Sequence, residues 1–449
     1  MPANASQNTS TATNTSSNTN ANQNPSTSPN PSASTNPNAP KSLAEKALLI
    51  FILAFMSSIA PLSTDMYLPA LPNVSKSFGV DDFFAELSLA SFFIAFAFGQ
   101  LIYGPLSDVF GRKKPLYIGL LLFITSSIGC VLVDSIYVFI ALRFFEALGG
   151  CAGVVIARAI VNDRFGLKDA ASIFALMMMV SSIAPMLAPT LGSMLLKFFT
   201  WQKIFLVLFL LGIALFLLII FALKESAPNL EKARFSHKET IKHYKIILSD
   251  KVFMSFVLSG ALAMGAMFAY ITGSSFVFIK VFELEESVYS AIFAINALGL
   301  MTCSMINARL VRSFSPFLIL RCAFLAMAFF ALVLLGVGVS LSGALGLDFI
   351  PKSLQIIIFE VALFITMSML GFLLPNLTTL AMARFKEYSG TASAILGMMQ
   401  FAIAGLVSFA VGAIGANTPF MLSCVMALAV WLGASLFLAF GAKHAKQAQ

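Results

Sequence analysis

The sequence predicts an all-α integral membrane protein whose twelve transmembrane helices form two six-helix lobes. Hydrophobic residues make up 59% of the 449 positions and charged residues 11%, whereas soluble domains are about a quarter charged. Apolar runs recur along the chain, each long enough to cross about 30 Å of hydrocarbon as a helix. A basic polar segment separates the first six runs from the last six.

The domain organisation follows from these runs. We expect a disordered tail at 1–44, because it consists almost entirely of Asn, Ser, Thr, Ala, Pro and Gln. An N-terminal lobe at 45–223, a linker at 224–250, a C-terminal lobe at 251–441 and a short tail at 442–449 follow. The spans are expected at 46–71, 83–103, 114–133, 136–163, 169–197, 202–223, 251–280, 287–308, 316–340, 353–383, 389–415 and 418–440.

Basic residues predict the orientation of the chain. Arg112, Lys113 and Lys114 follow the second span, and seven further Lys and Arg residues lie in or beside the linker. Because positively charged loops stay on the cytoplasmic side, we expect both of these segments in the cytoplasm. With an even number of spans, both termini are then cytoplasmic.

Composition also argues against several function classes. The net charge is +8, but the basic residues lie in short loops, so membrane topology explains them without a nucleic-acid partner. The five cysteines show no C-x-x-C spacing, which predicts neither disulfides nor a metal site. Because the sequence offers no nucleophile constellation, phosphate loop or metal-ligand cluster, we expect no cofactor and no enzymatic activity.

A charged segment between the second and third spans carries a motif, Gly104-x-x-x-Asp108-x-x-Gly111-Arg112-Lys113-Lys114. Its glycines and the flanking Pro105 and Pro115 predict a turn. The motif resembles the loop-2–3 signature of the major facilitator superfamily, although Val109 stands where that family usually has arginine. The resemblance implies a gating latch made by Gly104, Asp108, Gly111, Arg112 and Lys113. The alternative is a loop that only anchors topology.

The first span contains an acid in the string Ser63-Thr64-Asp65-Met66-Tyr67-Leu68-Pro69. An ionisable residue inside an apolar span is costly and marks a functional site by default. The string resembles the first helix of the bicyclomycin- and chloramphenicol-resistance (Bcr/CflA) branch of drug:proton antiporters, which implies a proton or cationic-substrate site at Asp65. The alternative is a structural acid bonded to Ser63, Thr64 or a helix end near the outer interface.

The fourth span contains three further ionisable residues, Arg143, Glu146 and Arg158. Arg143 and Glu146 are i,i+3 neighbours and can neutralise each other, so opening of this pair on protonation would couple charge to lobe motion. The segment from Arg143 to Gly150 resembles the superfamily's R-x-x-Q-G-x-G motif, and Arg158 resembles an arginine of the same branch. A structural ion pair and an interface-snorkelling arginine are the alternatives.

The fifth span contains Pro185 and Pro189 on one side, with Ala184, Ala188 and Gly192 forming a small-residue stripe. Proline bends a helix and small residues let a neighbour approach closely. The pattern resembles the superfamily's antiporter motif, which favours exchange over uniport. An ordinary packing kink is the alternative.

Three polar residues are expected to face a central cavity: Tyr67, Asn376 and Gln400. The resemblance, which covers 45–440, implies a proton-coupled efflux antiporter for small amphipathic drugs in the bacterial inner membrane. Its expected partners are a small-molecule substrate, protons and the lipid bilayer, with no nucleic acid and with the chain as a monomer. A metabolite transporter on the same fold, and a receptor or channel, remain alternatives.

Overall fold

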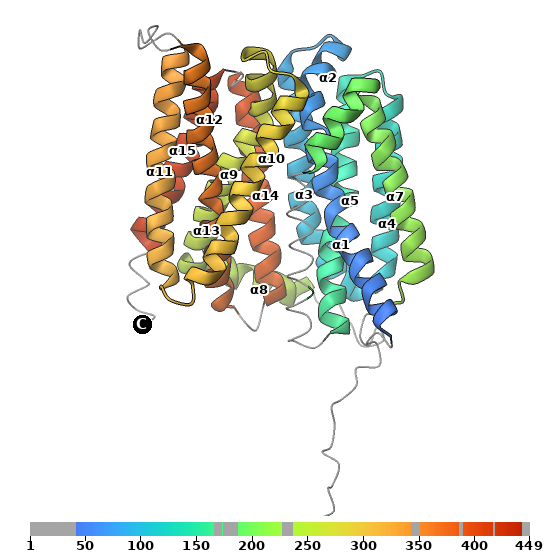
Figure 1. The fold of residues 1–449 in the computed structure, drawn as a ribbon. Coiled ribbons are helices and arrows are strands. Elements are labelled where there is room, and N and C mark those ends of the chain that lie inside the picture. Colours follow the sequence, from blue (N-terminus) through green and yellow to red (C-terminus); the bar gives the residue numbers. More distant parts are fainter. Residues whose placement is uncertain are drawn as a thin grey trace, which may run out of the picture. The chain divides into compact units, whose positions relative to one another are not determined.

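Long apolar helices make up most of the structure, a computed structural model (Figure 1). The described residues are 42–165, 173, 187–226, 237–342, 351–385, 389–415 and 418–441. The first helices are α1 (Leu43–Asp65), the short η1 (Leu68–Ala70), α2 (Leu71–Phe78), α3 (Asp82–Phe110), α4 (Lys113–Leu132), α5 (Ile136–Arg164) and α7 (Gln202–Ala222).

The second half of the chain repeats this pattern of long helices. It comprises α8 (His237–Ser249), α9 (Lys251–Ser275), η3 (Phe276–Val281), α10 (Glu286–Leu310), α11 (Pro316–Leu341), α12 (Lys352–Ser368), α13 (Leu370–Ala383), α14 (Ser389–Ile414), α15 (Pro419–Leu436) and η4 (Phe437–Gly441). The short α8 lies in the segment that the sequence predicts as a linker.

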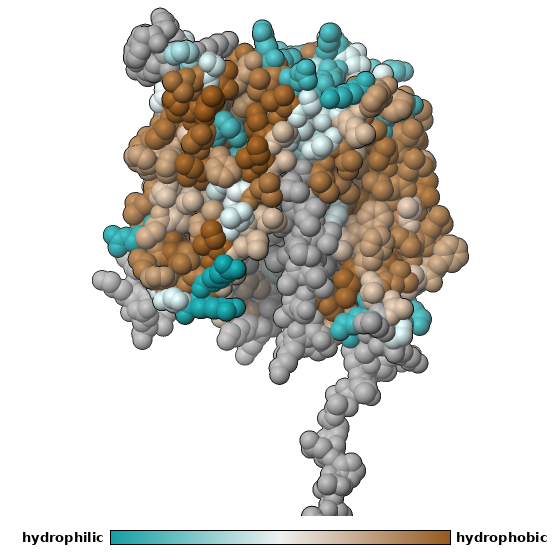
Figure 2. All heavy atoms as spheres, in the orientation of Figure 1, coloured by the Kyte–Doolittle hydropathy of each residue, from teal (hydrophilic) through white to brown (hydrophobic). Residues whose placement is uncertain are grey.

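Eleven helical segments of the described chain are long and apolar enough to cross a membrane. They correspond to eleven of the twelve predicted spans. Most of the remaining one, at 169–197, lies outside the described residues, although residues 187–198 are helical. Hydrophobic side chains cover the middle of the face in Figure 2 and hydrophilic ones gather at its two ends, as expected for a helical membrane protein.

The helices pack as two groups. In the N-terminal group, α1, α3, α4, α5 and α7 contact one another, and in the C-terminal group α9 to α15 do so. Close approach within the N-terminal group depends on glycine: a Cβ on Gly153 of α5 would lie 2.7 Å from the Met56 carbonyl oxygen of α1. Small residues at such crossings let membrane helices pack backbone to backbone.

The principal contact between the groups is α3 beside α14. Phe83 faces Phe409 near one end of this pair, and Phe96 faces Phe401 further along. We call the end with Asp82, where α3 begins, the Asp82 end, and the end with Arg112 the Arg112 end.

Two boundaries differ from the sequence prediction. The predicted turn over 104–115 is wrong for most of its length, because α3 continues through Pro105 to Phe110 and α4 begins at Lys113. The turn is confined to Gly111, whose φ of 83° favours glycine, and Arg112. The predicted first span at 46–71 also breaks: α1 ends at Asp65 and the chain continues through η1 into α2.

Candidate functional site: a cavity between the two helix groups

A cavity of about 560 Å³ lies between the two groups of helices. Its described lining comes from α1, α3 and α5 on one side and from α9, α10, α12, α13 and α14 on the other. Because both groups contribute walls, any change in how they pack must change the shape of this cavity.

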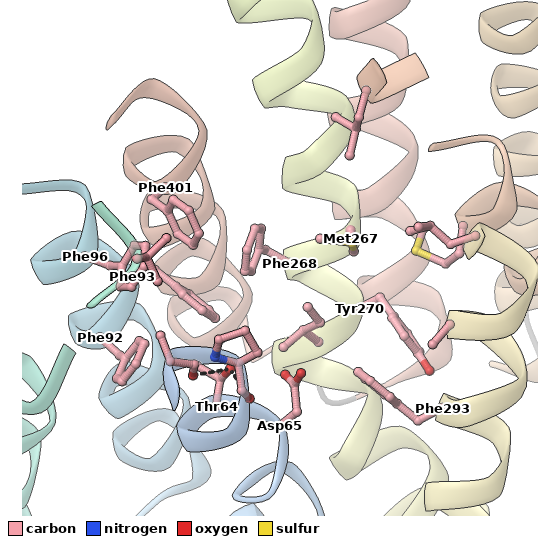
Figure 3. Close-up of a pocket in the computed structure, with 18 of the residues that line it drawn as sticks. Thr64, Asp65, Phe92, Phe93, Phe96, Met267, Phe268, Tyr270, Phe293 and Phe401 are labelled. Carbon is pink, nitrogen blue, oxygen red and sulfur yellow. Dashed lines mark hydrogen bonds between the residues drawn. The ribbon is translucent and has the colours of Figure 1, made fainter. Parts of the chain in front are cut away.

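Asp65 lies at the wall of the cavity (Figure 3). It is the last residue of α1 and is only 5% exposed. No salt bridge within the described chain neutralises it, and the carbonyl end of a helix adds negative potential there. Thr64, its neighbour, turns its hydroxyl back to the carbonyl oxygens of Ala60 and Pro61. The carboxylate therefore sits where negative charge is poorly stabilised unless a cation or a proton reaches it.

Aromatic rings form much of the remaining wall. Phe92, Phe93 and Phe96 of α3 lie opposite Phe268 of α9 and Phe401 of α14 (Figure 3). The ring centroids of Phe93 and Phe268 are 4.4 Å apart, as are those of Phe96 and Phe401. Both contacts join the two helix groups. The same rings therefore shape the cavity and hold α3 against the C-terminal group.

Polar groups are few but occupy distinct positions. Gln100 of α3 and Asn296 of α10 line the cavity. The Asn296 amide donates to Glu360 Oε1 over 2.9 Å and to the Tyr270 hydroxyl over 3.1 Å. Glu360, an acid of α12, is thereby connected to the wall through Asn296.

Arg158 is the basic residue among the described lining residues. It lies on α5 and its side chain is exposed. Among the described lining residues, Asp65 and Arg158 thus carry opposite charges in a largely apolar surround.

Arg143 and Glu146 lie elsewhere, sealed inside the N-terminal group. Arg143 Nη1 is 2.5 Å from Glu146 Oε2, and both side chains are fully buried. The Ser63 and Ser127 hydroxyls donate to the other Glu146 oxygen. The Arg143 guanidinium also lies over the rings of Tyr67, Phe92 and Phe205. The pair is connected to α1 through Ser63, two residues before Asp65, but it does not line the cavity.

The three residues expected to face the cavity are not among its described lining residues. Tyr67 is fully buried and its hydroxyl bonds with Ser88. Asn376 donates to Asn307 over 2.7 Å, which joins α13 to α10. Gln400 precedes Phe401, which does line the cavity. Tyr67 and Asn376 instead satisfy other buried polar groups, as burial requires.

The predicted latch residues gather at the Arg112 end of the N-terminal group. Arg112 bonds with Asp108, 2.5 Å away, and with Asp163 at the end of α5, 2.8 Å away. The backbone N–H groups of Arg112 and Lys113 donate to Glu225, just after α7. Burial would lower the pKa of Arg112, but its hydrogen bonds with Asp163 and Asp108 raise that pKa above its usual value. Gly104, on α3, has open space around it.

Of the predicted antiporter kink, Pro185 lies outside the described residues. Pro189 is buried, and its carbonyl oxygen accepts from Ser290 of α10 over 3.0 Å. A Cβ on Gly192 would clash with the carbonyl oxygen of Met66, the residue after Asp65. This helix therefore touches both the Asp65 segment and the C-terminal group.

Further polar contacts join the two groups at the Asp82 end. Lys280 Nζ lies 2.6 and 2.7 Å from the two Asp82 carboxylate oxygens. The Asn73 amide donates to Glu286 over 3.2 Å. Together with the bond between Ser290 and Pro189, they close the groups against each other at this end.

Sequence reasoning missed one acid altogether, Glu86 of α3, which is fully buried. An acid inside an apolar run was the available signal, the same one that identified Asp65. It also missed Asn296 and the cavity phenylalanines, which no local pattern distinguishes from lipid-facing ones. No group of three or more metal-ligating side chains occurs among the residues that the structure describes.

Comparisons with known proteins agree with this architecture. The family model of the Major Facilitator Superfamily matches residues 53–409. The chain is 33% identical over 395 residues to the MFS-type transporter YdgK of Bacillus subtilis, covering 88% of this chain and 95% of that protein. It is 27% identical to a bicyclomycin resistance protein homolog of Haemophilus influenzae, over 83% of this chain and 92% of that protein. It is 28% identical to the multidrug resistance protein MdtL of Escherichia coli O157:H7, over 57% of this chain and 64% of that protein.

Solved structures share the fold at low sequence identity. A D-xylose-proton symporter superposes with a TM-score of 0.66 at 12% identity, covering 87% of this chain and 97% of that one. The nucleoside transporter NupG superposes with a TM-score of 0.67 at 14% identity, over 88% of this chain and 99% of that one.

Proposed function

The chain belongs to the Major Facilitator Superfamily, and we propose that it is a proton-coupled antiporter that exports small amphipathic compounds by alternating access. The observation that carries this proposal is the position of Asp65. It is an acid without a salt bridge in the described chain, at the wall of an aromatic cavity between two helix groups. Central cavities at the interface of two halves are where secondary transporters bind their substrates.

The walls fit an apolar or aromatic substrate. Phenylalanine rings offer flat faces for stacking, and Met267, Met301 and Met367 supply flexible side chains that adapt to different shapes. Gln100 and Asn296 offer hydrogen bonds that orient a polar substituent. Such a surface accepts related compounds rather than one solute.

Exchange follows from competition at Asp65. With substrate bound, a positive or hydrogen-bond-donating group satisfies the carboxylate. When the substrate leaves to the outside, a proton takes its place, and the neutral cavity then permits the return to the inward-facing state. Arg143 and Glu146 hold α1 in position through Ser63, and Arg158 contributes positive potential to the cavity from α5, in the same helix group as Asp65.

We assign the Arg112 end to the cytoplasm of a bacterial cell, because its basic residues would stay inside. Both termini are then cytoplasmic and the membrane is the cytoplasmic (inner) one. The Asp82 end faces outward, so its contacts form the closed outer gate. The cluster around Arg112 holds the cytoplasmic ends of α3, α5 and α7 together as a latch.

Two relatives support export of drugs. One is named as a bicyclomycin resistance homolog and another as a multidrug resistance protein. One structural observation favours a second candidate, a transporter of a zwitterionic metabolite such as an amino acid. Asp65 and Arg158 present opposite charges to the same cavity, and a zwitterion carries the matching pair.

The test uses the purified full chain in proteoliposomes under an imposed pH gradient. The probes are ethidium, an aromatic cation, chloramphenicol, a neutral aromatic, and radiolabelled leucine, a zwitterion. We expect proton-driven movement of an aromatic probe, and we expect Asp65→Asn to slow it at least about tenfold, as loss of an essential intramembrane acid should. Asp134→Asn removes an exposed loop acid and serves as the matched control.

Two results decide against the proposal. If Asp65→Asn moves the probes at the wild-type rate with the same pH dependence, Asp65 does not carry the coupling. If leucine alone responds to the gradient, and Arg158→Gln abolishes that response, the metabolite transporter replaces drug export.

A further inference from the structure

Glu86 is a buried acid that the transport cycle described above does not use. It lies on α3, one turn after Asp82, with its side chain turned toward α14. Its exposed fraction is 0%, and neither carboxylate oxygen has a hydrogen-bond partner within the described chain. A buried carboxylate without partners is unfavourable when ionised and tolerable when protonated.

The facing surface of α14 is built to admit this side chain. A Cβ on Gly412 would lie 3.0 Å from Glu86 Oε2, so the absence of a side chain at this position leaves room for the carboxyl group. Nearby, the rings of Phe83 and Phe409 meet across the same interface. The whole of α14 carries no ionisable side chain. This helix therefore offers Glu86 a neutral contact.

The charged side chains close enough to act on Glu86 are Asp82, Asp81 and Lys280. Lys280 is already engaged with both oxygens of Asp82. Asp81 caps α3 by accepting from the Phe83 N–H over 2.9 Å. An ionised Glu86 would therefore be a third carboxylate beside a single lysine. Local charge opposes ionisation as long as the helices stay packed.

We propose that Glu86 is a proton switch of the outer gate, which takes up a proton when α3 and α14 close at the Asp82 end and releases it when they separate. On closing, a carboxylate oxygen forms an O–H bond with a proton from the outside solution. On opening, water reaches the carboxyl group, the O–H bond breaks and the proton returns to the same side. No proton crosses the membrane through Glu86.

This switch rests on the proposed alternating access and orientation, and it adds a regulation to them. External acidity favours the closed outer gate independently of the proton exchanged at Asp65. One linked proton changes the ratio of closed to open molecules by up to about tenfold per pH unit. The two acids have different roles. Asp65 exchanges the proton that drives transport, whereas Glu86 sets how readily the outer gate closes.

The experiment measures the gate directly, without transport. Spin labels are placed on the full chain in lipid nanodiscs at Ser77→Cys of α2 and Val288→Cys of α10, exposed positions on the two groups near the Asp82 end. The partly exposed Cys303, Cys322 and Cys424 are replaced by serine. Double electron–electron resonance measures the distance between the two labels and so gives the fraction of closed molecules. Measurements between about pH 5.5 and about pH 8.5 cover a range in which one linked proton changes that fraction measurably.

We expect the closed fraction of the unmodified gate to fall as pH rises. Glu86→Gln, which keeps the shape but cannot ionise, should stay closed across the range and lose the pH dependence. Glu86→Asp should retain it. Asp82→Asn removes the ion pair with Lys280 and should lower the closed fraction, and the freed lysine should shift the pH at which the gate opens. Asp65→Asn should keep the part of the pH dependence that Glu86→Gln removes.

Three results would overturn the switch. One is a closed fraction that does not change with pH, which would make Glu86 a permanently neutral packing residue. Another is an unaltered slope in Glu86→Gln. The third is transport of the aromatic probes at the wild-type rate in Glu86→Gln proteoliposomes, which an outer gate held closed could not support. Failure of transport in the unmodified protein would instead count against the proposed function, since the label distances do not depend on substrate.

Discussion

Arg143 Nη1 lies 2.5 Å from Glu146 Oε2 within the N-terminal helix group, and neither side chain reaches the cavity that Asp65 lines. Three aromatic rings and two serine hydroxyls surround the pair. Charges this deeply buried depend on each other, since the surrounding neutral groups cannot replace a missing counter-ion. The arrangement favours a role in holding α1, α4 and α5 together, with the proton carried elsewhere.

Removing one partner of this pair should therefore damage stability more than removing both. Glu146→Leu leaves the Arg143 charge uncompensated, and we expect a loss of about 3–5 kcal/mol, the usual effect of breaking a buried pair. The double variant Arg143→Met with Glu146→Leu should regain most of that loss. Thermal unfolding of the purified chain in detergent measures the apparent Tm of each variant.

The double variant also distinguishes a structural role of the Arg143–Glu146 pair from a role in proton coupling. If it folds and still exchanges protons for substrate, Glu146 is not required as a proton site. A stable double variant that binds substrate but no longer responds to pH would show the opposite, that the pair takes part in coupling.

At the Arg112 end, Arg112 should matter more than Asp108. The Asp108 side chain is 66% exposed and contacts Arg112 only at the surface, where an ion pair contributes about 0–1 kcal/mol. Arg112 is largely buried and also bonds with Asp163 and Ser107. We expect Arg112→Ala to lower the apparent Tm and to slow transport, and Asp108→Ala to have a small effect on both.

Asp163→Asn provides the matched comparison, because it weakens the buried contact of Arg112 and leaves the exposed one intact. An effect near that of Arg112→Ala is expected. If Asp108→Ala slows transport as strongly as Arg112→Ala without changing the Tm, the exposed acid acts in gating through a partner it meets in another conformation.

The sequence predicted the membrane helices well, because hydropathy reports directly whether a segment can cross a bilayer. The all-helical membrane fold is confirmed. The rotation of each helix about its axis was harder to predict. Phenylalanines lie on several sides of α3, so the sequence does not distinguish the cavity-lining Phe92, Phe93 and Phe96 from the exposed Phe98.

Polar residues were misjudged for a related reason. Tyr67 and Asn376 stood out as polar side chains in apolar runs, but their partners, Ser88 and Asn307, come from other helices. Only the tertiary structure shows that these groups satisfy each other away from the cavity. Asp65 stood out because an acid in an apolar span is costly in any orientation, although the same signal at Glu86 was overlooked.

Gly192 provides the sharpest test of how the Asp65 segment moves. A Cβ at this position would clash with the carbonyl oxygen of Met66, and backbone cannot yield as a flexible side chain does. Gly192→Ala must therefore push the helix at 187–198 away from the end of α1, at a cost of about 1–3 kcal/mol for overpacking. Because Asp65 precedes Met66, we expect slower proton-driven transport and an altered pH dependence.

Gly336→Ala of α11 is the matched control, since no atom lies within 4 Å of its added methyl group. It should leave transport unchanged and should not lower the Tm, because alanine is the better helix former by about 1 kcal/mol. If Gly192→Ala behaves like this control in stability and in its pH profile, the contact with Met66 yields without consequence. The helix at 187–198 would then not position Asp65. A normal Tm with a shifted pH profile, by contrast, would tie this close contact to the acid rather than to the fold.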